Sequence, residues 1–434
     1  MLQSQFDINK FKPFQTSSRL DSDVTGIYED KVVRIIPKKN DFYKGILQFS
    51  NELEYLIKSQ LFYENDESLI VEHEKLEHIT YYIEWTKKQR VIAAKAIISL
   101  QSHLSQKGYY LNDPHAFNIT FKFYQPIYFD FGSIKKGEIN PAWWFIKCFC
   151  GWTAMDYWDS VLSINKLKKA WIAIRIFFSS SPYQLLMKKI SKYEMSFLEK
   201  KIIFLLSRKG IGGQVIRKVV NSSSRIFKNF SNWTDYEQKS PSLDLENIRN
   251  KNVLHFLNQF NPKKVLDIGA NKGAYSLSAL ENGVDEVIAL DLDNFSLDYL
   301  FNEIKIGNRK ITIAKIDIMN YPDHPGFYQS YIPAHERLNS DFTVCLAVVH
   351  HVCYFGNCSF EEFAERLSRF SNKILIVEFV PYDDAHLTGP VYKGKDRSWY
   401  TIQNFISVMK KHFPDDHEIL ESFPSPRMLI RFSK

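Results

Sequence analysis

The sequence has few cysteines and no long apolar run. Its 434 residues include five cysteines whose spacings fit neither a CxxC pair nor a zinc site: Cys148, Cys150, Cys345, Cys353 and Cys358. We therefore expect reduced thiols in a cytoplasmic protein. No run of roughly 18 apolar residues occurs, so we expect no membrane-spanning helix. The first residues also lack the apolar core of a signal peptide.

Acidic residues are scarce in one segment. Between Val161 and Phe230 there are fifteen Lys or Arg residues and two Asp or Glu residues, which is more net positive charge than the +7 of the whole chain. Such a block can meet phosphate, an anionic glycan or an anionic membrane surface, including the inner membrane face. A solvated helix face is an equally good interpretation.

The remaining composition is that of a folded protein. The chain is 45% apolar and 24% charged, and its length favours two or three domains of ~150 residues each. The polar stretch SNWTDYEQKSPSLD marks a linker. We predict a first domain at 1–230 with a helical, basic final part, a linker at 231–246 and a second domain at 247–434.

Helices and strands mix in the first domain, which predicts an α+β fold. KVVRIIPK, Lys31–Lys38, is rich in β-branched residues and predicts a strand. The segments 44–62 and 91–108 have apolar residues at helical spacing and predict two helices, the second ended by Gly108. PIYFDFGS, at 126–133, predicts a short buried strand.

Strands alternate with helical or loop segments in the second domain. Five apolar, β-branched runs predict the strands: KKVLDIGA, EVIALDLD, KITIAKIDI, DFTVCLAVVHH and KILIVEFVP. This alternation predicts an α/β domain with a mostly parallel, Rossmann-like sheet and helices on both faces.

A glycine loop follows the first of these strands. VLDIGANKGAYS ends a strand at Asp267 and continues through Gly269, Asn271 and Gly273 into a helix that begins near Ala274. Glycines let the backbone turn sharply and approach a ligand closely. A related loop binds pyrophosphate in dinucleotide folds. An acid at the strand end would repel pyrophosphate, but it suits the positively charged amino-acid part of S-adenosylmethionine (SAM).

Two further acids follow the next strands. Asp291 ends the second strand, where a carboxylate can accept both ribose hydroxyl hydrogens, and Asp317 follows the third, where it can meet the adenine amino group. Ligands of such sheets bind at the carboxyl ends of the strands, so three acids there indicate one SAM site. The alternative is a generic α/β turn with incidental acids.

Residues 247–434 resemble a class I SAM-dependent methyltransferase. The resemblance extends to a bacterial family of nodulation-protein-like methyltransferases in which such a domain follows a kinase-like region. It is carried by EWTKKQRVIAAKAIISL, the LND-P-x-x-F-N-I stretch, PIYFDFGS, NWTDY, CLAVVHHV, ILIVEFVPYDD and SPRMLI. It implies SAM as cofactor and methyl transfer as the reaction, but it does not define a substrate.

His350 and His351 end the fourth predicted strand. A histidine near the transferred methyl can act as general base toward an acceptor hydroxyl in an in-line displacement. Side chains alternate along a strand, so we expect one of the two to pack in the interior, and both remain candidates. Glu378 and Asp383 are further candidates for substrate contact, although loop acids are more often solvated.

The first domain carries a second constellation. Asp113 and Asn118 have the spacing of a kinase catalytic loop, and Asp130-Phe131-Gly132 begins twelve residues after Asn118. In phosphoryl transfer Asp113 would accept the proton of the substrate hydroxyl, while Asn118 and Asp130 would hold magnesium. We therefore predict a kinase-like domain that binds ATP and magnesium if its site is active.

Three departures from the kinase pattern qualify this prediction. No GxGxxG precedes the 31–38 strand, which has only Gly26 before it, and Leu111-Asn112 replaces His-Arg. Arg34 occupies the position of the phosphate-binding lysine, and Glu52 or Glu54 could pair with it. Arg for Lys is not a neutral exchange. An active kinase, a nucleotide-binding pseudokinase and a structural relic all remain open.

The leading hypothesis is O-methylation of a glycan, a glycolipid or a related small molecule. One alternative is a bifunctional kinase and methyltransferase that modifies a polysaccharide end. Another is a methyltransferase fused to a nucleotide-binding scaffold. Nucleic acid is not an expected partner, because CLAVVHHV stands where amino-methylating enzymes usually have DPPY or NPPF.

Overall fold

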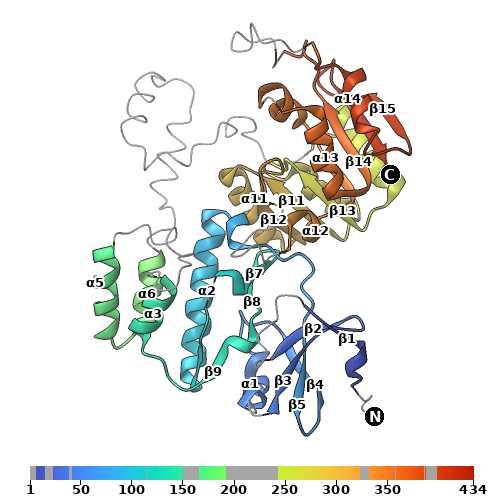
Figure 1. Ribbon diagram of the computed structural model, residues 1–434. Coiled ribbons are helices and arrows are strands. Elements are labelled where there is room, and N and C mark those ends of the chain that lie inside the picture. Colours follow the sequence, from blue (N-terminus) through green and yellow to red (C-terminus); the bar gives the residue numbers. More distant parts are fainter. Residues whose placement is uncertain are drawn as a thin grey trace. The chain divides into compact units, whose positions relative to one another are not determined.

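The structure is a computed structural model (Figure 1) that describes residues 6–14, 23–38, 42–114, 116–149, 166–191, 243–322, 332–356, 358–385, 387 and 398–434. The chain forms two compact units, one within residues 1–202 and the other within 203–434. The predicted boundary after residue 230 and most of the predicted linker lie outside the described residues.

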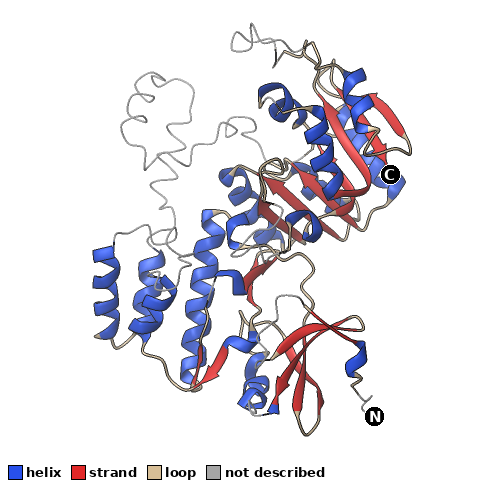
Figure 2. Ribbon diagram, in the orientation of Figure 1, coloured by secondary structure: helices blue, strands red, loops and turns tan. Residues whose placement is uncertain are grey.

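The first unit opens with a five-stranded antiparallel sheet in the order β1-β2-β3-β5-β4 (Figure 2). After the short 3₁₀ helix η1 (Ile8–Lys10), its strands are β1 (Phe11–Pro13), β2 (Val24–Tyr28), β3 (Lys31–Pro37), β4 (Ser59–Glu64) and β5 (Ser68–His73). The strand predicted at 31–38 is therefore confirmed. Gly26 faces Pro13 across β2 and β1, and a Cβ there would overlap the β1 backbone.

The predicted helix at 44–62 is wrong in its second half. Helix α1 spans Phe42–Ser50, and the chain then turns before β4. Asn51 explains the stop, because its side chain donates to the Ser59 carbonyl and accepts from the Ser59 amide, both at 3.1 Å. The Asn51 side chain thus takes both backbone groups of Ser59 as partners. Such side-chain to backbone bonds compete with continuation of the helix.

Helix α2 (Lys87–Gln106) confirms the second predicted helix. Its first turn is closed by a capping box in which Thr86 and Gln89 exchange side-chain to backbone bonds of 3.2 and 3.1 Å. It ends before Gly108, whose φ of 77° is a left-handed conformation that glycine tolerates.

Two small antiparallel pairs follow α2. One joins β6 (Tyr109–Leu111) to β9 (Ile134–Lys136), and the other joins β7 (Ile119–Lys122) to β8 (Gln125–Tyr128). The 3₁₀ helices η3 (Tyr82–Glu84), η4 (Ala116–Asn118) and η5 (Phe131–Ser133) connect neighbouring elements. Because β8 ends at Tyr128, Asp130 lies beyond the strand on which it was expected.

The described helices of the basic part are α3 (Pro141–Phe149), α5 (Lys166–Phe177) and α6 (Pro182–Ser191). They agree with the helical interpretation of this part. Most of the basic segment 161–230 lies outside the described residues.

The second unit contains a seven-stranded sheet in the order β12-β11-β10-β13-β14-β16-β15. Its strands are β10 (Lys264–Ile268), β11 (Glu286–Asp291), β12 (Ile311–Lys315), β13 (Ser340–Cys345), β14 (Ser371–Phe379), β15 (His417–Glu421) and β16 (Met428–Ser433). The first five in this spatial order pair in parallel and the last two are antiparallel. The predicted Rossmann-like, mostly parallel sheet is thus confirmed, whereas β15 and β16 were not predicted as strands.

The described helices of this unit are α9 (Ile248–Phe260), α10 (Ala274–Glu281), α11 (Asn294–Gly307), α12 (Ala334–Arg337), α13 (Phe360–Phe370) and α14 (Ile402–Met409). Helix α13 shows how they attach. Phe360, Phe363, Ala364 and Leu367 recur at helical spacing, and all are buried in the core. None of the described helices combines the length and apolarity needed to cross a membrane.

Candidate functional sites

The glycine loop lies at the carboxyl end of β10. Gly269 and Gly273 have φ values of 79° and 83°. A side chain at Gly269 would overlap Val348, and one at Gly273 would overlap Leu300. Both positions therefore need glycine for their backbone angles and for space. Helix α10 begins directly after Gly273, as predicted.

Asp267 lies beneath this loop and is buried, with 3% of its surface exposed. The Ser276 hydroxyl donates to its Oδ2 at 2.6 Å. Burial raises the pKa of Asp267 to about 6, and the charge of Asp291 adds to the rise. Among the described residues no cationic side chain pairs with Asp267, so its negative charge is left without a counter-ion. Such a carboxylate fits a cationic ligand group.

Asp291 ties the loop to the next strand. Its Oδ2 accepts the Asn271 amide at 2.7 Å, and its Oδ1 accepts the Asp293 amide at 2.8 Å. The Asn271 side chain in turn accepts from Ser296 at 2.9 Å. Burial raises the pKa of Asp291, and these backbone bonds oppose the rise. The structure therefore brings Asp267, Asp291 and the loop together at one sheet edge.

Asp317 follows β12 at the same edge, since β12 pairs with β11 in parallel. Its carboxylate accepts the Met319 amide at 3.0 Å and the Asn320 side chain at 2.8 Å. Asp317 is half-buried and keeps contact with solvent.

The histidines are not on the strand where they were expected. Strand β13 ends at Cys345, and Ala347 has a left-handed φ of 53° that interrupts the extended chain. His350 and His351 instead open a π-helical turn, η7 (His350–Phe355), with their ring centroids 3.9 Å apart. They share one side rather than alternating. His350 is buried, whereas His351 is half-exposed.

Glu378 lies near the end of β14 and is fully buried. Its Oε1 accepts the Ser422 hydroxyl at 2.5 Å, and Arg249 Nη1 lies 3.7 Å from the same oxygen. Asp383 is exposed, whereas its neighbour Asp384 is buried and bound by Arg427 at 2.8 and 3.2 Å. Of the two predicted substrate acids, Glu378 is thus the one inside the fold.

Arg249 and Tyr275 were missed in the sequence. Arg249 lies in α9, the helix directly before β10, and its guanidinium lies 5.8 Å from the Tyr275 ring. Burial raises the pKa of Tyr275, and the charges of Arg249, Glu378 and Asp267 act on it as well, so these groups surround its hydroxyl. The only sequence signal is position, because Tyr275 follows the glycine loop at once.

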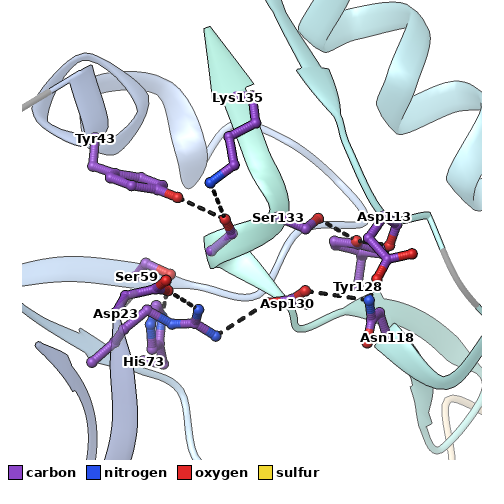
Figure 3. A network of polar contacts seen from close by, with 12 residues as sticks. Asp23, Tyr43, Ser59, His73, Asp113, Asn118, Tyr128, Asp130, Ser133 and Lys135 are labelled. Carbon is purple, nitrogen blue, oxygen red and sulfur yellow. Dashed lines mark hydrogen bonds and ion pairs between the residues drawn. The ribbon is translucent and has the colours of Figure 1, made fainter. Parts of the chain in front are cut away.

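A second polar network lies in the first unit (Figure 3). Asn118 Nδ2 donates to Asp130 Oδ2 at 3.2 Å, and the two side chains point toward one another. Asn118 also donates to the Asp113 carbonyl at 2.9 Å, and the Tyr128 hydroxyl donates to the same carbonyl at 2.8 Å. The Asp113 side chain is exposed. The structure therefore brings all three predicted residues together.

Arg34 pairs with Asp23 and with Asp130, 3.3 Å away, and not with Glu52 or Glu54 as expected. Both glutamates are exposed in the turn after α1. Asp23 was missed because it lies outside the predicted strand. Removal from water raises the pKa of Asp130, and Arg34 opposes the rise. His73 lies close by with its pKa lowered to about 3, first by burial and then by Arg34, so its ring is neutral.

Metal and thiol chemistry find little support in the described part of the chain. No three His, Cys, Asp or Glu side chains in it converge as they would around a metal ion. Cys148, Cys345, Cys353 and Cys358 are free thiols there, in agreement with the expected reduced state. Cys150 lies outside the described residues.

No family model matches the chain. Among curated proteins it is similar to nodulation protein NoeA of Rhizobium meliloti strain 1021, with 24% identity over 370 residues that cover 79% of this chain and 77% of NoeA. This similarity agrees with the resemblance to nodulation proteins noted in the sequence.

Methyltransferases are among the solved structures that match. Magnesium protoporphyrin IX methyltransferase ChlM from Synechocystis PCC 6803, solved with bound SAH, is 16% identical, with 51% of this chain and 98% of that chain covered and a TM-score of 0.32. The bifunctional kinase-methyltransferase WbdD is also 16% identical. That match covers 41% of this chain but only 36% of WbdD, with a TM-score of 0.29.

Proposed function

We propose that the second unit is a SAM-dependent methyltransferase that O-methylates a glycan, a glycolipid or a related small molecule. The observation that supports this most is Asp267, a buried carboxylate that has no counter-ion among the described residues and lies beside a loop that requires two glycines. A cationic ligand with an amino-acid part would supply the missing charge.

The residues at this edge fit the parts of SAM. Asp267 would bind the ammonium group, Asp291 the ribose hydroxyls and Asp317 the adenine amino group. Arg249, whose Nε has no hydrogen-bond partner in the described part of the chain, would bind the carboxylate. When bound, SAM supplies an electrophilic methyl group on its sulfonium.

His351 is the better candidate for general base. It is half-exposed, so an acceptor hydroxyl can reach it, and a histidine pKa near neutrality suits proton removal. His350 is buried and packs against both His351 and Phe355, which would orient the neighbouring ring. The different burial of the two rings on η7 supports this division of roles.

Calorimetry with S-adenosylhomocysteine tests the cofactor site, and transfer of label from SAM to a glycolipid extract tests the reaction. His351→Ala should lower turnover by about 10² to 10⁴-fold while the affinity for S-adenosylhomocysteine stays unchanged. A protein that binds no S-adenosylhomocysteine would contradict the proposal. If His351→Ala kept full turnover, the assignment of the base would be wrong.

For the first unit we propose nucleotide binding, with Arg34, Asn118 and Asp130 as the residues concerned. The supporting observation is that Arg34, Asn118 and Asp130 share one polar network although Arg34 lies 96 positions before Asp130, and that Asn118 also donates to the backbone carbonyl of Asp113. Calorimetry with ATP, alone and with magnesium, tests this. Phosphate transfer to a glycan would favour the bifunctional alternative, and binding without turnover would favour the scaffold.

We also propose an anionic membrane surface as a partner, with a peripheral, cytoplasmic location, and the exposed side chains of helix α5 support the membrane contact. Ile172, Ala173 and Ile176 are buried, whereas four apolar side chains on α5 and just beyond its end are exposed by more than half: Trp171, Ile174, Phe177 and Phe178. A helix with exposed aromatic residues in a basic segment is typical of interfacial binding.

Sedimentation with phosphatidylglycerol vesicles tests this partner. Trp171→Ser should reduce the bound fraction, whereas Trp143→Ser, which removes an equally exposed tryptophan from α3, should not. Equal losses in both variants would contradict the assignment to α5, and so would binding that phosphatidylcholine vesicles reproduce.

A further inference from the structure

The guanidinium of Arg34 is held in a nearly closed environment. Its side chain is 11% exposed, and both of its ionic partners are carboxylates, from Asp23 before β2 and from Asp130 before η5. Its Nε nevertheless has no hydrogen-bond partner among the described residues. Arg34 therefore carries a donor that no described part of the protein uses.

His73 adds a second unused atom beside it. Its Nδ1 is hydrogen-bonded to the Ser59 hydroxyl at 2.8 Å, and its Nε2 is buried with no hydrogen-bond partner in the part of the chain that the structure describes. Val32 faces His73 across β3 and β5, so His73 and Arg34 lie on the same sheet face. Arg34 Nε and His73 Nε2 are thus buried polar atoms without described partners, beside the ion pairs of Arg34. Leaving both atoms unpaired costs free energy unless a ligand bonds to them.

Gly132 makes room for this arrangement. A Cβ at this position would overlap both the Arg34 guanidinium and the Asp23 carboxylate. The Tyr43 hydroxyl and Lys135 Nζ donate to the Gly132 carbonyl at 2.7 and 3.1 Å, which fixes the turn (Figure 3). The backbone therefore forms one wall of the site.

Magnesium does not fit the residues as they are arranged. One oxygen of Asp130 faces the Arg34 guanidinium at 3.3 Å and the other accepts from Asn118 at 3.2 Å. A divalent ion on Asp130 would lie beside a positive charge of the same sign, and magnesium demands near-octahedral oxygen ligands.

We propose that Asp23 is a built-in competitor for a phosphate group at Arg34, and that the first unit binds nucleotide phosphate without magnesium. This proposal rests on the proposed nucleotide binding. A phosphate can replace the Asp23 carboxylate because the planar guanidinium binds both anions in the same bidentate way. Exchange of one anion for the other leaves the charge on Asp130 compensated.

Calorimetry of the full chain in EDTA, with saturating S-adenosylhomocysteine to fill the second unit, tests this with ATP, tripolyphosphate and adenosine as separate probes. Asp23→Asn should tighten ATP and tripolyphosphate binding by about tenfold or more, because it removes a charge-assisted competitor. Magnesium should change the affinity of the wild type for ATP by less than about threefold.

Glu72→Gln is the matched control. Glu72 pairs with Lys31 on the same sheet, and its side chain is 18% exposed against 13% for Asp23. Glu72→Gln removes one negative charge, as Asp23→Asn does, but at a position that is not paired with Arg34. Its ATP affinity should therefore stay at the wild-type value. Equal gains in both variants would mean a general charge effect and would overturn the proposal.

Asp130→Asn separates this site from a magnesium site. In this proposal Asp130 acts on the nucleotide only through Arg34, so removal of its charge should tighten binding, whereas a magnesium-dependent site would lose its ligand and its affinity. Asp130→Asn also preserves the test if Asp23→Asn does not fold. If wild type and variants bind no ATP even with magnesium, the proposed nucleotide binding fails as well. If ATP binds only with magnesium and Asp23→Asn has no effect, this inference alone fails.

Discussion

Asp267 in the second unit and Asp130 in the first are similar carboxylates in opposite electrostatic settings. Each lies at or just after the end of a strand, each precedes a glycine by two residues, and each has its pKa raised by removal from water. Asp130 faces Arg34, whereas Asp267 accepts from the hydroxyl and the backbone amide of Ser276 and meets no cationic side chain among the described residues. The charge of Asp130 is therefore compensated by an arginine, whereas no described cation compensates the charge of Asp267.

This difference indicates which site is prepared for a cation. A buried carboxylate without a counter-ion destabilises the free protein and gains free energy when a cationic ligand binds. A carboxylate already paired with arginine gains little from a second cation. The two units therefore show that an acid near a glycine turn does not by itself identify a cation site.

Removal of Arg34 should give the largest effect. Arg34→Gln leaves Asp23 and Asp130 close together without compensation, which should lower the free energy of unfolding by about 3 kcal/mol or more. Urea denaturation of the full chain measures this. Lys10→Gln, which breaks the exposed pair with Glu29, should leave the value unchanged. If Arg34→Gln left the free energy of unfolding unchanged, Arg34 would not be compensating Asp23 and Asp130, and the contrast with Asp267 would fail.

The unmatched charge of Asp267 should appear in the pH dependence of stability. Its pKa is about 6 in the folded protein and near 3.8 when unfolded, so the folded state binds the proton more tightly. Stability should therefore fall as pH rises from about 4 to 6, by up to about 3 kcal/mol from this residue. In Asp267→Asn the free energy of unfolding, measured by urea denaturation at each pH, should lose this part of its pH dependence. If the stability of wild type and variant changed with pH in parallel, the prediction would be wrong.

Loss of the Asp267 charge should weaken cofactor binding. Asp267→Asn removes a charged hydrogen-bond acceptor, so the affinity for S-adenosylhomocysteine should fall by about 10 to 100-fold in calorimetry. The wild-type affinity should rise with pH through about 6 as Asp267 ionises. Asp285→Asn, which removes an exposed acid paired with Lys263, serves as control and should bind normally.

Asp317 should give the smallest effect. Its carboxylate is half-buried and already accepts from Met319 and Asn320. Asp317→Asn keeps one acceptor oxygen, so the affinity for S-adenosylhomocysteine should fall by about two- to fivefold. A loss as large as that of Asp267→Asn would place the main charge recognition at the adenine end.

The candidate SAM site was accessible from the sequence because it depends on regular geometry. Parallel strands end at one sheet edge, so acids after successive strands meet there whatever the details of packing. Asp291 and the glycine loop are joined in this way, because the Asn271 amide donates to the Asp291 carboxylate. Arg249 was not accessible in this way, since nothing local indicates that α9 would bring it to Glu378, 129 positions later in the chain.

Local competition explains the errors in secondary structure. Apolar spacing favoured a helix through residue 62, but the Asn51 side chain ends it by bonding to Ser59. A run of apolar residues favoured a strand through His351, but the left-handed Ala347 interrupts it. In the first case a side chain bonded to the backbone ended a periodic pattern, and in the second one left-handed residue ended an apolar run.

The alternation of apolar runs with helical segments was enough to determine the Rossmann-like sheet, and the positions of its acids were enough to place them at one edge. The tertiary structure alone decided which charges are matched. Arg34 meets Asp130 across 96 positions of chain, and Asp267 meets no cation among the described residues. Burial and partner choice depend on the packing of distant segments, and these determine whether a carboxylate is closed by the protein or left for a ligand.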